Sequence, residues 1–186
     1  MTDAITADTS RNDLFKIAGG GVLSGIVTPL MPLLVDKIGG AAGNVGIALV
    51  ALPFAVLVFA VVRRQSVNPA WAALAAAFVT MIAFVCAVNA AVFIDAQAGG
   101  AAKAMRNILA GLAGGLVGAA VMALGIALLP AGPRKAAAWL PMLMTGAVAG
   151  TLLALDGAFE LDLTSVLYPV WQAGVAVRLA LALRRS

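Results

Sequence analysis

The chain has 186 residues, of which 63% are apolar and only 11% are charged, and it contains no histidine. Soluble domains have about 45–50% apolar and about 25% charged residues, so a soluble fold of this length could not bury so much apolar surface. The absence of histidine excludes bis-His haem ligation, His-based zinc or copper sites and the commonest general base.

Six apolar runs are long enough to cross a bilayer, whose hydrocarbon core of about 30 Å needs about 20 helical residues. A polar stretch at residues 1–10 precedes them, and we expect it to be a disordered cytoplasmic tail. The sequence therefore predicts an all-α, polytopic membrane protein with a single domain over residues 11–186, a bundle of six transmembrane helices. The predicted spans lie near residues 17–35, 45–62, 70–94, 108–129, 138–155 and 163–183.

The first run is interrupted by Pro29 and Pro32, which follow the glycines at 19–21. It is preceded by an aspartate-bearing tail and not by a basic region, so we interpret it as a retained span and not as a cleaved signal. Broken helices line binding sites in several transporter folds, which makes Thr28 and Pro29 candidates for a substrate pathway. The alternative is that prolines are simply commoner in membrane helices than in soluble ones.

The third run begins after Asn68-Pro69, which predicts an asparagine N-cap followed by proline at the first helical position. Trp71 and Trp139 open the third and fifth runs, where amphipathic rings are expected at the inner interface.

The basic residues predict the orientation of the bundle. If all six runs cross, the side that carries both termini has nine of the twelve basic residues and the other side has three. Cytoplasmic loops are rich in Lys and Arg, so we expect a multi-pass protein of the inner (cytoplasmic) membrane with both termini in the cytoplasm. The nine are Arg11, Lys16, Arg63, Arg64, Arg134, Lys135, Arg178, Arg184 and Arg185, and the three are Lys37, Lys103 and Arg106.

Three aspartates follow apolar runs on the predicted outer side: Asp36, Asp95 and Asp156. Charged residues belong where hydration costs nothing, so the simplest interpretation is that they mark the water boundary. The alternative is an acidic mouth that concentrates cations.

Overlapping G-x-x-x-G patterns in the fourth run pair Gly111 with Gly115 and Gly114 with Gly118. Glycines four residues apart share one helix face and let a second backbone approach closely. The pattern predicts tight helix packing here, either within the chain or between protomers of a homo-oligomer.

Asn89 and Gln172 are the most informative polar residues within the runs, because neither amide can satisfy all its groups through its own helix. They predict either hydrogen bonds between helices or contact with a substrate. Together with Thr28 and Pro29 they form the candidate substrate pathway.

No catalytic motif is found: the sequence has no nucleophile elbow, Walker loop, dinucleotide fingerprint or metal-ligand cluster. We therefore expect no catalytic residue, no metal, no cofactor and no nucleic-acid partner, with the lipid bilayer as the main partner. Two functions remain open. One is a small transporter, channel or membrane-embedded transport subunit, and the other is a non-catalytic assembly subunit whose glycine faces bind other membrane subunits.

Overall fold

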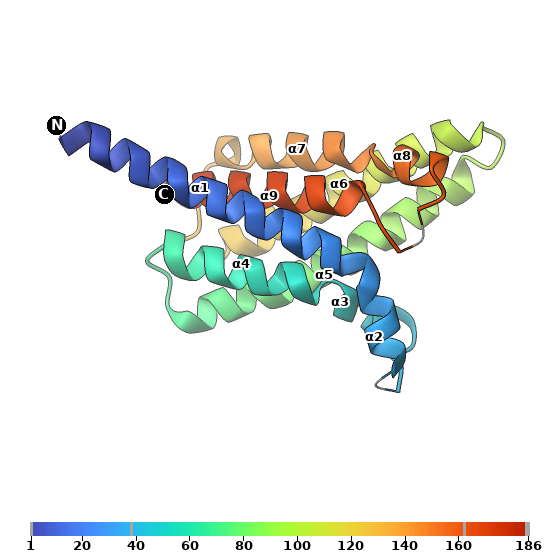
Figure 1. Ribbon diagram of the computed structural model, residues 1–186, viewed down its shortest axis with the longest axis horizontal. Coiled ribbons are helices and arrows are strands. Elements are labelled where there is room, and N and C mark those ends of the chain that lie inside the picture. Colours follow the sequence, from blue (N-terminus) through green and yellow to red (C-terminus); the bar gives the residue numbers. More distant parts are fainter. Residues whose placement is uncertain (1, 38, 162, 185–186) are drawn as a thin grey trace.

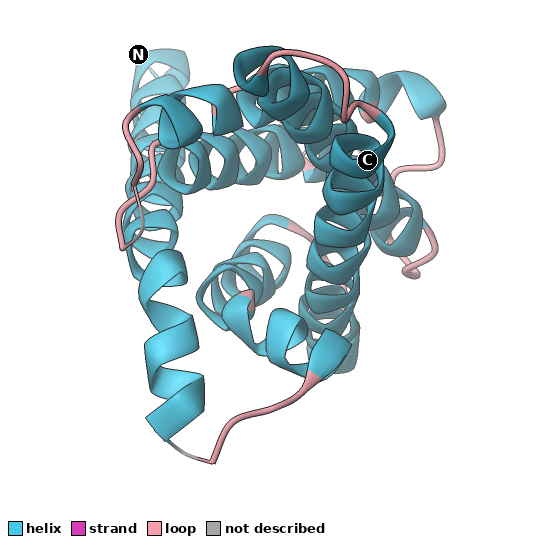
Figure 2. Cartoon of the chain, turned by 90° about the vertical axis from the view of Figure 1, so that its right-hand side faces the viewer, coloured by secondary structure: helices cyan, strands magenta, loops and turns pink. Residues whose placement is uncertain are grey.

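The computed structural model describes residues 2–37, 39–161 and 163–184, with the backbone alone for residues 2–10. Within these ranges every regular element is a helix, and short loops join the helices (Figure 2). This confirms the all-α fold. In hydrocarbon, a helix satisfies its backbone N–H and C=O groups internally, which long apolar runs require.

The helices follow each other along the chain as α1 (Thr2–Val27), α2 (Met31–Lys37), α3 (Gly43–Val50), α4 (Leu52–Gln65), α5 (Ala70–Gln97), α6 (Lys103–Ala127), α7 (Leu140–Gly150), α8 (Leu153–Ala158) and α9 (Leu167–Leu183). Two 3-10 turns, η1 (Thr28–Leu30) and η2 (Ala136–Ala138), precede α2 and α7. Figure 1 shows an elongated bundle in which α1 begins and α9 ends at the same end, while α2 and α8 lie at the other.

Four helical segments of the described chain are long and apolar enough to cross a membrane: Arg11–Lys37, Ala70–Gln97, Lys103–Ala127 and Leu140–Ala158. The pair α3 and α4 gives a fifth only if it counts as one span, because the two helices are bent by 54°. The apolar helix α9 has 17 residues, or about 26 Å at 1.5 Å per residue, a few ångströms less than the hydrocarbon core. A crossing by all six runs stays a prediction.

In the structure α1 begins at Thr2, within the polar N-terminal stretch, and the disorder expected for residues 1–10 stays a prediction. A helix that has nucleated in the apolar part extends easily, because each added residue gains one hydrogen bond without a new nucleus. Met1 and Arg185 lie outside the described residues.

Prolines lie at or near the starts of helical segments. Pro29 lies in η1, while Pro53 and Pro141 lie in the first two residues of α4 and α7. Pro169 is the third residue of α9. A missing N–H has no intrahelical partner to lose in a first turn, so these prolines set where helices begin. The sharpest bend lies between α3 and α4, not in the first run.

The N-cap predicted for Asn68 is wrong, because α5 has Pro69 at its N-cap and no side-chain cap. Asn68 is buried and instead accepts a hydrogen bond from the Ala131 N–H at 2.9 Å, which ties together the loops before α5 and after α6. Trp139 is also buried, and its indole N–H donates to the Pro133 carbonyl at 3.0 Å.

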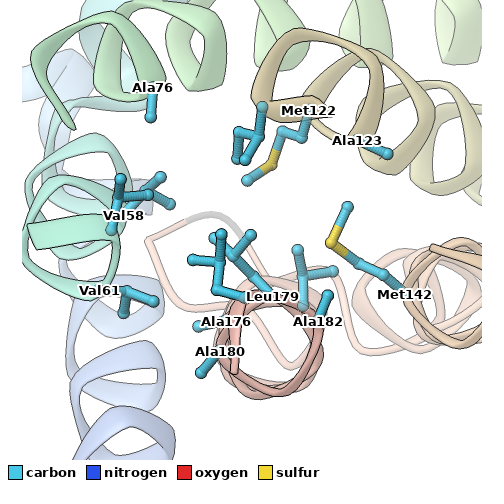
Figure 3. Packing of buried hydrophobic residues seen from close by; sticks show 14 of the residues in the cluster. Val58, Val61, Ala76, Met122, Ala123, Met142, Ala176, Leu179, Ala180 and Ala182 are labelled. Atoms are coloured by element: carbon cyan, nitrogen blue, oxygen red, sulfur yellow. The ribbon is translucent and has the colours of Figure 1, made fainter. Parts of the chain in front are cut away.

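The apolar core lies in the half of the bundle that contains the chain ends. In Figure 3, Leu179 of α9 lies among Val58 of α4, Met122 of α6 and Met142 of α7. All four side chains are fully buried. These large side chains fill the space between helices in this half.

Large apolar side chains also cover the outside of the helices. Leu23, Phe78, Leu124 and Val148 belong to four different helices, and each is more than half exposed. Soluble monomers rarely expose apolar surface on this scale, whereas lipid-facing helices do so throughout. The long apolar helices and this exterior indicate a membrane location.

Candidate functional site

Gln172 of α9 is 1% exposed, and its amide is bonded to Ser24 of α1 and to Thr28 of η1. Its Oε1 accepts from Ser24 Oγ at 2.6 Å, and its Nε2 donates to Thr28 Oγ1 at 2.9 Å. Thr28 in turn donates to the Ser24 carbonyl at 2.9 Å. The Ser24 hydroxyl also lies 3.0 Å from the Gly21 carbonyl, so two acceptors share its single proton. These bonds join the first and last long helices.

Glycines on α1 make this contact possible. A methyl group on Gly21 would overlap the backbone of Gln172 and Ala173, and one on Gly25 would overlap the backbone of Pro169. Because neither glycine has a side chain, α1 lies directly against the α9 backbone. This close approach brings the hydroxyls of α1 within reach of the Gln172 amide.

The structure brings only part of the predicted substrate pathway together. Thr28 and Gln172 are bonded to each other, and Pro29 follows Thr28 in η1. Asn89 lies on α5 and is exposed. Its Nδ2 donates to the Val85 carbonyl at 2.8 Å and to Asn44 Oδ1 of α3 at 3.3 Å. The four residues therefore do not line one continuous path.

The predicted outer aspartates lie near the ends of α2, α5 and α8. Asp36 is exposed. Asp95 forms a two-pronged ion pair with Arg106, at 2.9 Å to Nε and 2.6 Å to Nη2, which joins α5 to α6. Asp156 accepts from Ser165 Oγ at 2.6 Å and from the Val166 N–H at 2.7 Å, at the start of α9. The latter two aspartates thus hold helix ends in place.

The glycines of α6 form two faces, and both contact helices of the same chain. A Cβ on Gly111 or Gly115 would overlap the backbone of α7 at Gly150 or Gly146. The other face contacts α5: a Cβ on Gly114 would lie 2.9 Å from the Ala87 carbonyl oxygen. On the same face, a Cβ on Gly118 would lie 3.1 Å from the Ala87 Cβ. Within this chain, α6 is packed between α5 and α7.

A cavity of about 240 Å³ lies between α5, α6 and α9, in the half of the bundle away from the chain ends. Its wall is mostly apolar and includes four aromatic rings: Phe54, Phe84, Tyr168 and Trp171. The Phe54 and Trp171 rings meet edge to face with centroids 5.6 Å apart, and the Phe84 and Tyr168 centroids are 6.0 Å apart. Glycines of α6 and α7 complete the wall with bare backbone.

The indole N–H of Trp171 is the one buried side-chain nitrogen or oxygen of the described residues that has no hydrogen-bond partner. An indole nitrogen is only a donor, and leaving a buried donor unpaired costs about 1–3 kcal/mol. Since buried donors in native proteins are nearly always paired, this N–H requires an explanation. Trp171 also lines the cavity, but its nitrogen is itself enclosed by protein atoms.

Sequence reasoning did not predict the cavity as such, although one residue of the predicted substrate pathway, Gln172, lies in its wall. A signal is present on α5, where Ala83, Ala87 and Ala91 recur every fourth residue and all line the cavity. Such a stripe predicts either close helix packing or open space, and only the position of the neighbouring helix decides between them.

No group of three or more Asp, Glu, Cys or His that could hold a metal is found in residues 2–37, 39–161 and 163–184. Comparison of the chain with known protein families, with curated proteins and with solved structures found no match. The cavity and its aromatic wall are therefore the features from which a function is inferred.

Proposed function

We propose that the protein is a small membrane-embedded transporter, or the membrane subunit of a transport system, that holds an apolar solute in the cavity beside Trp171. The observation that carries this proposal is an apolar cavity between the helices, open on one side where the exposed Val92 lines it, in a bundle whose exterior is apolar as well. Ligand sites are typically apolar cavities with a few placed polar groups, and they often lie between the helices of bundles.

The polar cluster around Gln172 adjoins this cavity, since Gln172 is part of the wall, but the Gln172 amide is already paired. The Gln172 amide oxygen has a partner on α1 and the amide nitrogen has one on η1, which suits a contact between helices. A polar route through the bundle would need groups that exchange partners with a solute, whereas these groups hold each other. The cavity is the better supported solute site.

The proposed topology is six crossings with both termini in the cytoplasm, in the inner membrane. The excess of basic residues at the end where α1 begins supports this orientation. The few ångströms that α9 lacks can be met by local thinning of the bilayer, which costs fractions of a kcal/mol per ångström. We propose no catalytic step, no cofactor and no nucleic-acid partner.

A role as an assembly subunit is the second candidate. It is favoured by the bonding of Ser24, Thr28 and Gln172 to each other and by the extent of apolar surface that faces outward. The glycine faces of α6 are occupied within the chain, so a partner would bind another surface. Extraction in mild detergent should then retain a partner at a fixed ratio.

Filling the cavity tests the transport proposal. Val88→Trp places a large ring in the cavity wall, whereas Leu124→Trp changes a residue that is 69% exposed and outside the wall. In liposomes, counterflow of a labelled apolar solute should saturate with the wild type and with Leu124→Trp, and it should be lost with Val88→Trp. Passive permeation does not saturate. Equal counterflow by all three proteins would refute the assignment of the cavity.

A further inference from the structure

We infer that Arg178 of α9, held against Thr145 of α7, binds the phosphate of an anionic phospholipid from the leaflet that surrounds the chain ends. Neither residue lines the cavity, and Leu179, which follows Arg178, belongs to the core in the other half of the bundle. The inference therefore goes beyond the proposed function and does not depend on it. Three properties of Arg178 carry it: its exposure, its free donors and its lack of a counter-charge within the described chain.

Arg178 is a charged side chain on an apolar exterior. From Trp171 to Leu183 it is the one exposed residue of α9, and all others in this stretch are buried or half-buried. The neighbouring helix α7 is apolar where it is exposed: Met144, next to Thr145, is 57% exposed, and Leu140, one turn earlier, is 58% exposed. A charge among lipid-facing apolar side chains is costly unless an anion pairs with it.

The guanidinium is held to α7 by one of its nitrogens. Arg178 Nε donates to Thr145 Oγ1 at 3.3 Å, and the Thr145 hydroxyl donates to the Pro141 carbonyl at 2.7 Å. The two helices are close at this point, because a Cβ on Gly174 would lie 2.7 Å from Thr145 Cγ2. The Nη1 and Nη2 groups of Arg178 have no acceptor within the described chain. Donors of this pair suit two oxygens of one phosphate.

The depth of Arg178 matches that of the lipid phosphates. Arg178 lies five residues before the end of α9, and Thr145 lies five residues after the start of α7. Each is therefore about 8 Å from a helix end at 1.5 Å per residue. A long arginine side chain spans such a distance to the headgroup region while its methylene groups stay in the apolar layer.

The described chain supplies no counter-charge to Arg178. Of the described acidic side chains, one lies at the end of the bundle with the chain ends, and this residue, Asp13, pairs with Arg184 at 3.5 Å. The others lie at the opposite end, on α2, α5 and α8 or just after α8: Asp36, Asp95, Asp156 and Glu160 (Figure 1). The anion that neutralises Arg178 must therefore come from outside these residues.

An anionic phospholipid fits this position better than an acidic partner protein. Lipid phosphates already lie at the membrane interface, whereas a partner's carboxylate would lose its hydration on being buried there. Arg134 and Lys135 precede α7 and are also exposed, which adds positive charge near the start of this helix. Basic sites between membrane helices bind anionic headgroups, and each Lys or Arg near the surface strengthens the attraction. The excess of positive charge favours a lipid with a net negative charge over a zwitterionic lipid.

The test measures lipid binding to the full chain in a mild detergent, with bound lipids counted by native mass spectrometry. The probes are dioleoyl phosphatidylglycerol and dioleoyl phosphatidylcholine. They share their acyl chains and their phosphate, but only phosphatidylglycerol has a net negative charge. We expect the first phosphatidylglycerol to bind at least about five-fold more tightly than the first phosphatidylcholine, as one basic residue near an anionic headgroup provides.

Three variants assign this binding to Arg178. Arg178→Gln should lower the affinity for phosphatidylglycerol about five-fold. Arg64→Gln is the matched control, because Arg64 is exposed at the same end of the bundle, on α4, and its replacement removes the same charge. This control should bind phosphatidylglycerol as the wild type does. Arg178→Leu places an apolar side chain at a lipid-facing position, so it should fold even if Arg178→Gln does not, and it should show the same loss.

Three outcomes would overturn the inference. If wild type binds the two lipids equally, the site does not select an anionic lipid. If the Arg178 variants bind phosphatidylglycerol as tightly as wild type, or if Arg64→Gln loses as much affinity as they do, no lipid site lies at Arg178. If wild type retains a protein at a fixed ratio that Arg178→Gln releases, the counter-charge belongs to a partner protein. None of these outcomes affects counterflow through the cavity, which tests the proposed function separately.

Discussion

Replacing Gln172 by leucine should lower the stability of the bundle by only about 1 kcal/mol, given its two hydrogen bonds to Ser24 of α1 and Thr28 of η1. Such bonds between membrane helices average about 0.6 kcal/mol each, with a maximum near 1.7 kcal/mol. The loss should be near the average and not near the maximum, because neither Ser24 nor Thr28 is left without a hydrogen-bond partner when Gln172 is replaced. Ser24 keeps the Gly21 carbonyl at 3.0 Å, and Thr28 keeps the Ser24 carbonyl at 2.9 Å.

A double-mutant cycle isolates the bond to Thr28. Thr28→Val and Gln172→Leu, alone and together, should show a coupling of about 0.6 kcal/mol in unfolding by a denaturing detergent. Thr145→Val is the control, since Thr145 also donates to a carbonyl one turn earlier, that of Pro141, and it does not line the cavity that Gln172 lines. This hydrogen bond stays within α7, so its coupling to Gln172→Leu should lie within about 0.3 kcal/mol of zero.

Two results of these measurements would contradict the assignment of the Gln172 amide to the contact between helices. If Thr28 and Gln172 are uncoupled, the bond between α1 and α9 does not contribute to stability. If Gln172→Leu leaves stability unchanged but abolishes solute binding, the amide serves the cavity and not the contact with α1. Either result would reverse the preference for the Trp171 cavity over the Gln172 cluster.

Two other contacts give testable effects on stability: the glycine contact between α6 and α7, and the hydrogen bonds of Asp156 at the start of α9. Gly115→Ala should destabilise the protein by about 1–3 kcal/mol in detergent unfolding, because the added methyl would overlap the Gly146 backbone. In the control Gly19→Ala, the methyl meets nothing within 4 Å, so this variant should be neutral or stabilising. Equal stability of the two variants would contradict the close packing of α6 and α7. Asp156→Ala should destabilise the start of α9 by about 1 kcal/mol, as a lost cap does, whereas Asp156→Asn keeps an acceptor and should cost much less. Hydrogen exchange at the first turn of α9 measures this difference, and unchanged exchange in Asp156→Ala would refute the capping role.

The helical fold was predictable because it depends on composition and on the length of the apolar runs, and both can be counted from the sequence. An apolar run of about 20 residues has few alternatives to a helix in a bilayer. The helix ends were less predictable. Asn68 has the sequence context of an N-cap but bonds to the loop after α6, since tertiary contact can override local capping.

The candidate site was also predictable only in part. Gln172 was identified because a buried amide needs partners, and Thr28 because it lies in the proline-interrupted first run; each proved to be the other's partner. Asn89 follows the same rule, but its partner lies on α3, which no sequence spacing indicates. The cavity depends on how far α9 lies from α5, and that distance follows from the packing of all the helices together. No local sequence pattern predicts the distance between α9 and α5.

The unequal packing of the two halves bears on which kind of transport protein this is. The cavity lies in one half, whereas Val58, Met142 and Leu179 fill the other half and are fully buried. Phe54, Ala83 and Met122 belong to both, since they line the cavity and join the core cluster. A solute could pass the core only if α4 and α9 separated there, and close-packed interiors resist such movement unless a second arrangement exists. Solute binding by the purified chain without counterflow would therefore favour a membrane subunit that is opened by a partner, whereas counterflow by the chain alone would require the core itself to rearrange.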